Sequence, residues 1–289
     1  MASTQALKSR IRSVKNTKQI TKAMQLVAAS KMRRAQEADK ASAPYTKVAS
    51  ELLTYLASQM VANDHPLFAR RKVKSRLVII ISSDKGLAGA YNTNIFKAYM
   101  RELSQADTDN VSVKTIAVGR KISQFVTRIK GTDVVGVYES IGDRPTGREL
   151  HAILDTARDM FLAGEVDAVD VVYTEFISSL TQVPRVQRLL PAGFGSEKVS
   201  DFVKEAKYEP NPSAVLDAVA YRLVGAQLYQ ALLDARASEH SMRMVAMKNA
   251  TDNASDLVDD LTLAMNKARQ GAITQELAEI SGGVEALND

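Results

Sequence analysis

The C-terminal third of the chain constrains the fold more than any other segment. After Pro212 no proline occurs, and small or apolar residues recur every three or four positions, which is typical of a helical heptad seam. As one helix, capped by Ser213 and stopped before Gly282, residues 213–281 would span about 105 Å. A compact domain of ~140 residues is only about 35–40 Å across, so this helix has to leave its domain. The expected seam is Met247, Ala250, Ala254, Leu257, Leu261, Ala264, Ala268 and Gly271.

The N-terminal segment predicts a second long helix. No proline or glycine occurs before Pro44, and a helix over residues 3–43 would be about 60 Å long. Pro44 is expected to kink or break it, because proline lacks a backbone donor and crowds the preceding turn. Residues 45–60 again have the pattern of a helix. The apolar stripe of the first helix starts with Leu7, Ile11 and Val14.

The two ends carry opposite charge. Residues 1–36 hold five Lys, four Arg and no acid, whereas residues 251–289 hold eight acids and two bases. If the terminal helices pair antiparallel, residue i is expected near residue 266 − i, within several positions. That register sets Leu7 beside Leu257 and Leu261 and leaves residues 267–289 as a lone helical tip. Exposed ion pairs contribute only about 0–1 kcal/mol each, so charge would set register more than stability. The expected ionic partners are Lys8, Arg10, Arg12 and Lys15 on one helix and Asp252, Asp256, Asp259 and Asp260 on the other.

Between the arms the pattern alternates between short apolar runs and amphipathic segments. Such alternation predicts an α/β domain, Rossmann-like, with a mostly parallel sheet covered by helices. Pro184 marks the last strand as an edge strand. The predicted boundaries are a helical arm over 1–69, the α/β domain over 70–208, and a second arm with the tip over 209–289. Strands are expected at 77–81, 111–118, 134–138, 168–177 and 183–190, and helices at 93–103, 120–130 and 146–163.

Composition excludes several classes of chemistry. Apolar residues at 45% and charged residues at 25% are typical of a folded soluble protein. The chain has no Cys, which removes disulfides, thiolate metal sites and Cys nucleophiles. Its three His are far apart in sequence, and its longest apolar run, residues 77–81, suits a buried strand. We therefore expect no catalytic residues, no metal, no cofactor and no membrane-inserted segment.

The loop over residues 82–92 follows a strand and precedes a helix. A phosphate could bind at such a helix N-terminus, but no GxGxxG or GxxxxGK[ST] pattern is present. A tight structural turn is the favoured interpretation. Asp84 could be a nucleophile or a magnesium ligand; without an acidic partner motif, a capping role is favoured.

The basic N-terminus has three interpretations. It is acid-poor and amphipathic, as in a transit peptide. Nine positive charges would also give salt-dependent binding to nucleic acid. The third interpretation is a helix that faces acidic protein surfaces. The heptad-like apolar stripe favours the third, because a disposable peptide needs no matching partner helix.

Five segments together resemble the γ subunit family of F-type ATP synthases. Two lie near the N-terminus (residues 11–24 and 27–35), two near the C-terminus (243–254 and 266–277), and one in the centre (83–87). Their order along the chain matches the architecture expected above. The resemblance implies a non-catalytic rotor shaft, in which a coiled coil of the terminal helices turns inside a ring of three α and three β subunits. Rotation driven by proton flow would then force the β subunits through ATP synthesis.

The resemblance also implies partners and contact residues. The central domain would rest with the ε subunit on the membrane c-ring. At the shaft's tip, the residues expected to contact β are Arg269, Gln270 and Thr274. At its waist, Lys22 and Met24 would face a β lever loop, with Arg243 close by. Gly271 stands where the family usually has Ala, and it should soften the tip helix by up to ~1 kcal/mol.

Location follows from the same resemblance. The family's matching segment begins within the first ten residues, so we expect no transit peptide and a bacterial protein, peripheral on the cytoplasmic face of the inner membrane. Two alternatives stay open. One is a nucleotide-binding α/β enzyme with coiled-coil oligomerisation arms, and the other is a coiled-coil nucleic-acid binder. Neither explains both terminal patterns.

Overall fold

The computed structural model describes residues 4–58, 65–129, 131–142, 147–193, 199–205, 207, 209 and 212–288. The chain forms two compact units. One combines residues up to Val27 with those from Met244 onward, and the other extends from Ala28 to Arg243. Both divisions fall inside long helices, so the boundaries expected near residues 69 and 209 stay predictions.

The two terminal helices are longer than the sequence pattern suggested. Helix α1 covers Thr4–Ser58 without a break at Pro44, and α6 covers Pro212–Asn288, beyond the stop expected at Gly282. Proline removes one backbone hydrogen bond and glycine costs about 1 kcal/mol, and neither penalty by itself ends a helix that is anchored on both sides. Beyond Pro44, the anchor is Ala49 and Leu53, which are buried in the core.

The first unit is an antiparallel pair of helices. On α1 the inward positions include Leu7, Ile11 and Val14, of which Ile11 is 8% exposed. On α6 a series of buried or half-buried positions recurs in alternating steps of four and three. They are Met247, Thr251, Ala254, Val258, Leu261, Met265 and Ala268.

This seam corrects every second position of the expected one. Val258 is turned inward where Leu257 was expected, and Leu257 is 42% exposed. Thr251 is buried at the next such position, beside Ala250, which is half-buried. Its hydroxyl lies 2.8 Å from both the Thr21 hydroxyl and the Met247 carbonyl, so a polar residue is satisfied inside the seam. Composition alone pointed to the more apolar neighbour.

The pairing register also differs from the expected rule. The rule placed Lys18 opposite Lys248, but the Lys18 ammonium donates to the Ser255 hydroxyl at 2.9 Å. It placed Thr21 opposite Val245, whereas Thr21 lies against Thr251. The register is therefore displaced by six to seven residues, nearly two helical turns.

The second unit contains a five-stranded sheet with strand order β3-β2-β1-β4-β5. The first four strands are parallel, and β5 runs antiparallel at the edge, as Pro184 predicted. The strands are β1 (Ser75–Ile81), β2 (Ser112–Val118), β3 (Asp133–Tyr138), β4 (Ala168–Phe176) and β5 (Gln182–Leu190). The helices between them are α2 (Tyr91–Thr108), α3 (Arg120–Val126) and α4 (Gly147–Leu162), with the short elements η2 (Pro66–Phe68) and α5 (Asp201–Lys204) elsewhere.

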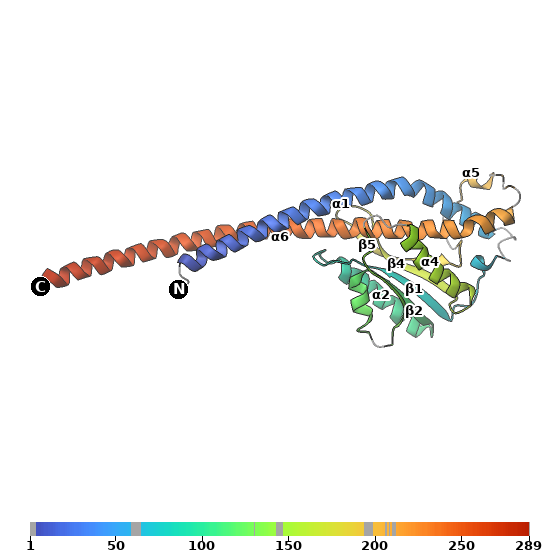
Figure 1. Cartoon of the computed structure of the whole chain (residues 1–289), viewed down its shortest axis with the longest axis horizontal. Helices are drawn as coiled ribbons and strands as arrows, with labels where there is room; N and C mark the ends of the chain where they lie inside the picture. The colour runs from blue at the N-terminus through green and yellow to red at the C-terminus, as the bar shows by residue number, and fades with distance from the viewer. Residues whose placement is uncertain are drawn as a thin grey trace. The chain divides into compact units, whose positions relative to one another are not determined.

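The sheet separates two hydrophobic cores. Alternate residues of β1 point to opposite faces, so Leu77, Ile79 and Ile81 pack against α1, α4 and α6, while Val78 and Ile80 pack against α2 and α3. Figure 1 shows α4 and α6 on one side of the sheet and α2 on the other. The continuous apolar run of β1 follows from burial on both faces. The α/β class with a mostly parallel sheet is confirmed.

The central part of α6 is enclosed on all sides within this unit. Every residue from Ala231 to Ser241 is buried, although this stretch includes Asp234, Arg236 and Glu239. A helix enclosed in this way is usually apolar around its circumference. The charged residues therefore need partners inside the protein, and these partners define the first site below.

We predict that Gly271→Ala stiffens the helix tip. Gly271 lies inside α6, and a methyl group added there meets no atom within 4 Å. Alanine should stabilise the local helix by up to about 1 kcal/mol, because glycine has the larger conformational entropy to lose. Hydrogen exchange monitored by mass spectrometry should then slow about fivefold in the surrounding peptides. Gly225→Ala is the control, since its methyl would meet Leu154 Cδ2 at 3.2 Å. Unchanged exchange around residue 271 would contradict the prediction.

Candidate functional site

Three charged side chains follow one another along the enclosed part of α6. Glu239 accepts from Arg236 Nη1 at 2.9 Å through one carboxylate oxygen and from Arg243 Nη2 at 2.8 Å through the other. All three residues are at most 9% exposed. Their spacing of three and four residues places them on one face of the helix. The result is a buried Arg–Glu–Arg triad with one net positive charge.

The triad holds the loop that follows β1. Arg243 donates to the carbonyls of Lys85 at 3.2 Å and Gly86 at 3.4 Å. Arg236 lies 3.6 Å from Asp84 and donates to the carbonyl of Ile141 at 2.5 Å. The remaining positive charge is thus neutralised by Asp84 and by carbonyl dipoles. Two of the loop's carbonyl groups bind a guanidinium, whereas a phosphate-binding loop presents N–H groups to its ligand.

Asp84 has the capping role that the sequence favoured. Its Oδ1 accepts from the backbone N–H of Arg120, the first residue of α3, and from that of Ser140, both at 3.0 Å. A carboxylate at a helix N-terminus is stabilised by the unpaired N–H groups there. Asp84 therefore joins three segments: its own loop, α3 and the segment after β3. No group of three or more His, Asp or Glu among the described residues is arranged to hold a metal ion.

A second buried charge on α6 lies toward α1. Asp234 is 9% exposed, and burial, the nearby Asp39 carboxylate and Glu175 together raise its pKa to about 7. A backbone hydrogen bond from Phe176 and the charge of Arg185 oppose this shift. Burial also raises the pKa of Asp39, which accepts a hydrogen bond from Gln230. Two carboxyl groups from different helices thus face each other in the core.

The expected shaft residues lie in the paired unit, with one exception. Lys22 is exposed and donates to Gln25 at 3.3 Å, and Met24 is half-buried. Arg269, Gln270 and Thr274 are exposed, with the Thr274 hydroxyl donating to the Gln270 carbonyl at 2.9 Å. Arg243 belongs to the other unit and to the buried triad. Of the apolar pairing residues, Ile11 and Leu261 are buried, Leu7 and Val14 are half-buried, and Leu257 is exposed.

The tip of α6 has no partner helix among the residues that the structure describes. Every residue from 269 to 278 is exposed, as expected for a lone helix. Ile273 is 50% and Leu277 60% exposed, and Ile280 continues the apolar set at 64%. Apolar side chains grouped on an exposed surface are typical of a protein interface. No helix among the described residues is long and apolar enough to cross a membrane.

The expected ion pairs between the arms are not formed. Lys8, Arg10, Arg12 and Lys15 are exposed, and within the described ranges no ion pair joins them to an acid of α6. Charges in a helix pair interact across the seam only from flanking positions. The α6 acids point outward, at heptad positions remote from the seam. The four acids are Asp252, Asp256, Asp259 and Asp260.

Sequence reasoning missed the buried charges on α6. The spacing Arg236, Glu239, Arg243 was a usable signal, because opposite charges three and four residues apart form helical pairs. Nothing in the sequence indicated that the pairs would be buried. Asp234 gave no signal, since its environment depends on Asp39 and Glu175, which are remote in the chain.

This chain is similar to known proteins over nearly its whole length. Residues 3–287 match the family model described as ATP synthase. The chain is 41% identical to the ATP synthase gamma chain of Stenotrophomonas maltophilia (strain R551-3), over 99% of this chain and 100% of that one. The chain belongs to the ATP synthase gamma chain family. The gamma chain of Haemophilus influenzae (strain PittEE) is 38% identical, with the same coverage of both chains.

Solved structures agree with the fold. A chain in the rotational state 3 structure of the Euglena gracilis mitochondrial ATP synthase aligns with a TM-score of 0.67 and 17% identity, over 98% of this chain and 94% of that one. A chain in the central stalk and c-ring structure of the Tetrahymena thermophila enzyme aligns with a TM-score of 0.60 and 24% identity, over 80% and 99%. The family model and the two gamma chains confirm the family resemblance drawn from the terminal and central segments.

We predict that Glu239→Gln destabilises the protein strongly. The substitution leaves Arg236 and Arg243 buried without their shared carboxylate, which should lower the free energy of unfolding by about 3 kcal/mol. Urea unfolding followed by tyrosine fluorescence measures the change. Glu37→Gln is the matched control, because Glu37 pairs with Arg33 on the surface at 3.7 Å and should matter by less than about 1 kcal/mol. Equal effects would disprove a special role for the buried triad.

We predict that Asp234→Asn stabilises the protein more at pH 8 than at pH 5. The folded state binds the Asp234 proton more tightly than the unfolded chain, so stability falls as pH rises from about 4 to about 7. Asparagine removes this dependence, and the gain should be about 2–3 kcal/mol larger at pH 8. Asp107→Asn, an exposed position on α2, is the control. The same gain at both pH values would show that Asp234 does not titrate in this range.

Proposed function

We propose that the chain is the central rotor shaft of an F-type ATP synthase. In this role it couples transmembrane proton flow to ATP synthesis at the β subunits, and it is itself not catalytic. The observation that carries the proposal is the α6 tip, where apolar and polar contact residues are all exposed on one helix of a gamma-chain family member. A surface of this kind needs a surrounding partner to cover Ile273 and Leu277.

We propose that a ring of three α and three β subunits surrounds the shaft. Arg269, Gln270 and Thr274 would contact β at the tip, and Lys22 and Met24 would face a lever loop lower on the shaft. Four exposed basic residues of α1 support an acidic partner there, because they form no ion pair with an acid of the described chain: Lys8, Arg10, Arg12 and Lys15. Arg243 would act differently from the other contact residues, because it is buried and donates hydrogen bonds to the loop after β1.

The proposed base of the shaft lies at the membrane. The similar Tetrahymena thermophila structure contains a central stalk together with a c-ring, and we propose a contact with a c-ring here, together with an ε subunit. The chain would then be peripheral on the cytoplasmic face of a bacterial inner membrane. The buried triad suits this role, since charged pairs in a low-dielectric interior resist displacement of α6 relative to the sheet.

A nucleotide-binding enzyme is the competing function. The loop after β1 was its candidate site, and there the carbonyls of Lys85 and Gly86 accept from Arg243. The same loop would have to release α6 before it could accept a phosphate. The geometry therefore favours the shaft.

We predict that native mass spectrometry of the tagged chain, purified from membranes of its own cells, shows one copy with three copies each of two larger partners. The exposed tip and the unpaired basic residues would be covered in that assembly. A tagged, unrelated membrane-associated protein handled in parallel is the control for non-specific capture. A lone chain or a small homo-oligomer, under conditions that keep other large assemblies intact, would disprove the shaft.

A further inference from the structure

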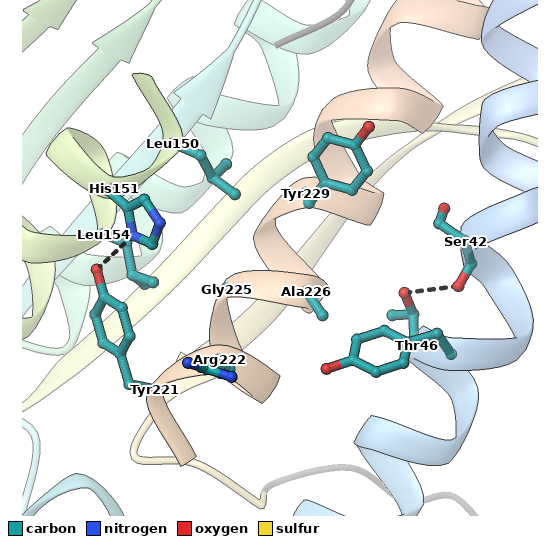
Figure 2. Close-up of a pocket in the computed structure, with 11 residues that line it drawn as sticks. Ser42, Thr46, Leu150, His151, Leu154, Tyr221, Arg222, Gly225, Ala226 and Tyr229 are labelled. Atoms are coloured by element: carbon teal, nitrogen blue, oxygen red, sulfur yellow. Dashed lines mark hydrogen bonds between the residues drawn. The ribbon is translucent and has the colours of Figure 1, made fainter. Parts of the chain in front are cut away.

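A cleft of about 660 Å³ lies in the second unit between α1, α4 and α6. Figure 2 shows α6 along its floor, with Leu150, His151 and Leu154 of α4 on one side and Ser42 and Thr46 of α1 on the other. Its volume is in the range of small-molecule sites, about 300–1,000 Å³. None of the roles proposed above uses it.

Aromatic side chains form the walls of the cleft, and small residues of α6 form its floor. Tyr45 comes from α1, and Tyr221 and Tyr229 come from α6. His151 stacks nearly parallel on Tyr221, with ring centroids 5.9 Å apart. Between the two α6 tyrosines, the small side chain of Ala226 leaves room above the helix, whereas Gly225 is covered by Leu154. Because aromatic side chains stack on planar groups, this cleft favours a flat ligand.

The polar groups of the cleft fall into two sets. The Tyr221 hydroxyl is engaged, since it donates to Asp155 at 2.7 Å and lies 3.1 Å from His151 Nδ1. By contrast, the hydroxyls of Tyr45 and Tyr229 and the guanidinium of Arg222 make no hydrogen bond or ion pair with any described residue. Three groups that line one cleft are thus available to a ligand.

Charge decides the class of ligand. Among the described residues, Arg222 is the only Lys or Arg that lines the cleft, and no Asp or Glu does. A guanidinium binds carboxylate, sulfonate or phosphate groups through two parallel hydrogen bonds. We propose that this cleft binds a flat aromatic molecule that carries one acidic group, with its rings between the tyrosines and its anion on Arg222. This proposal rests on the cleft alone and does not depend on the rotor function.

The test uses the full-length chain and 8-anilinonaphthalene-1-sulfonate, an aromatic anion with a flat naphthalene ring that fluoresces when bound. Saturable binding with one site per chain is expected. Arg222→Gln should weaken it about tenfold, whereas N-phenyl-1-naphthylamine, which has the same rings without the sulfonate, should bind both proteins equally. Ala226→Leu places a larger side chain in the cleft and should weaken the binding of both probes.

Arg101→Gln is the matched control, because Arg101 is an exposed arginine on α2, far in sequence from the cleft. Circular dichroism checks that each variant is folded. Arg222 is itself exposed, so its substitution tests the proposal even if Ala226→Leu fails to fold. Binding that is non-saturable, that is unchanged in Arg222→Gln, or that falls equally in Arg101→Gln would overturn the proposal.

Discussion

The structure depends on how charge is accommodated where α6 is enclosed. From Ala231 to Ser241 every residue is buried, so each charged group there must find its partner inside the protein. Glu239 joins Arg236 and Arg243, and the loop after β1 completes the neutralisation. Removing one partner of such a network costs far more than the network contributes relative to an apolar core. The charges therefore specify which loop and which helix face meet, more than they add stability.

The same helix contributes two kinds of surface. In its central part, side chains and backbone groups of the sheet unit are fixed around it, including the Ser238 hydroxyl on the Thr174 carbonyl at 3.1 Å. In its last described turns, residues 269 to 278 are all exposed. An enclosed segment holds a helix in place, and an exposed segment is free to meet a partner. The proposed shaft needs both properties in one continuous helix.

The carboxyl pair of Asp39 and Asp234 departs from this pattern of neutralisation. Burial and mutual repulsion favour the protonated form of Asp234, so the contact of α1 with α6 in this unit depends on a proton as well as on packing. Gln230 moderates the repulsion by donating to Asp39 while it accepts from Ser42 at 2.8 Å. A buried network that is only partly satisfied is sensitive to its conditions.

The sequence alone determined the strands and the family, but not where the two terminal helices end. Alternation of apolar runs predicted all five strands, and five short segments identified the family, because both signals are local in the chain. Tertiary structure decided the rest. In the helix pair, Val258 is turned inward and Leu257 is exposed, and Thr251 is more deeply buried than Ala250. The two helices pair six to seven residues away from the expected register. The sequence also contained no sign that Asp234 and the triad would be buried. The free energy of burying a charged side chain depends on neighbours that are distant in sequence.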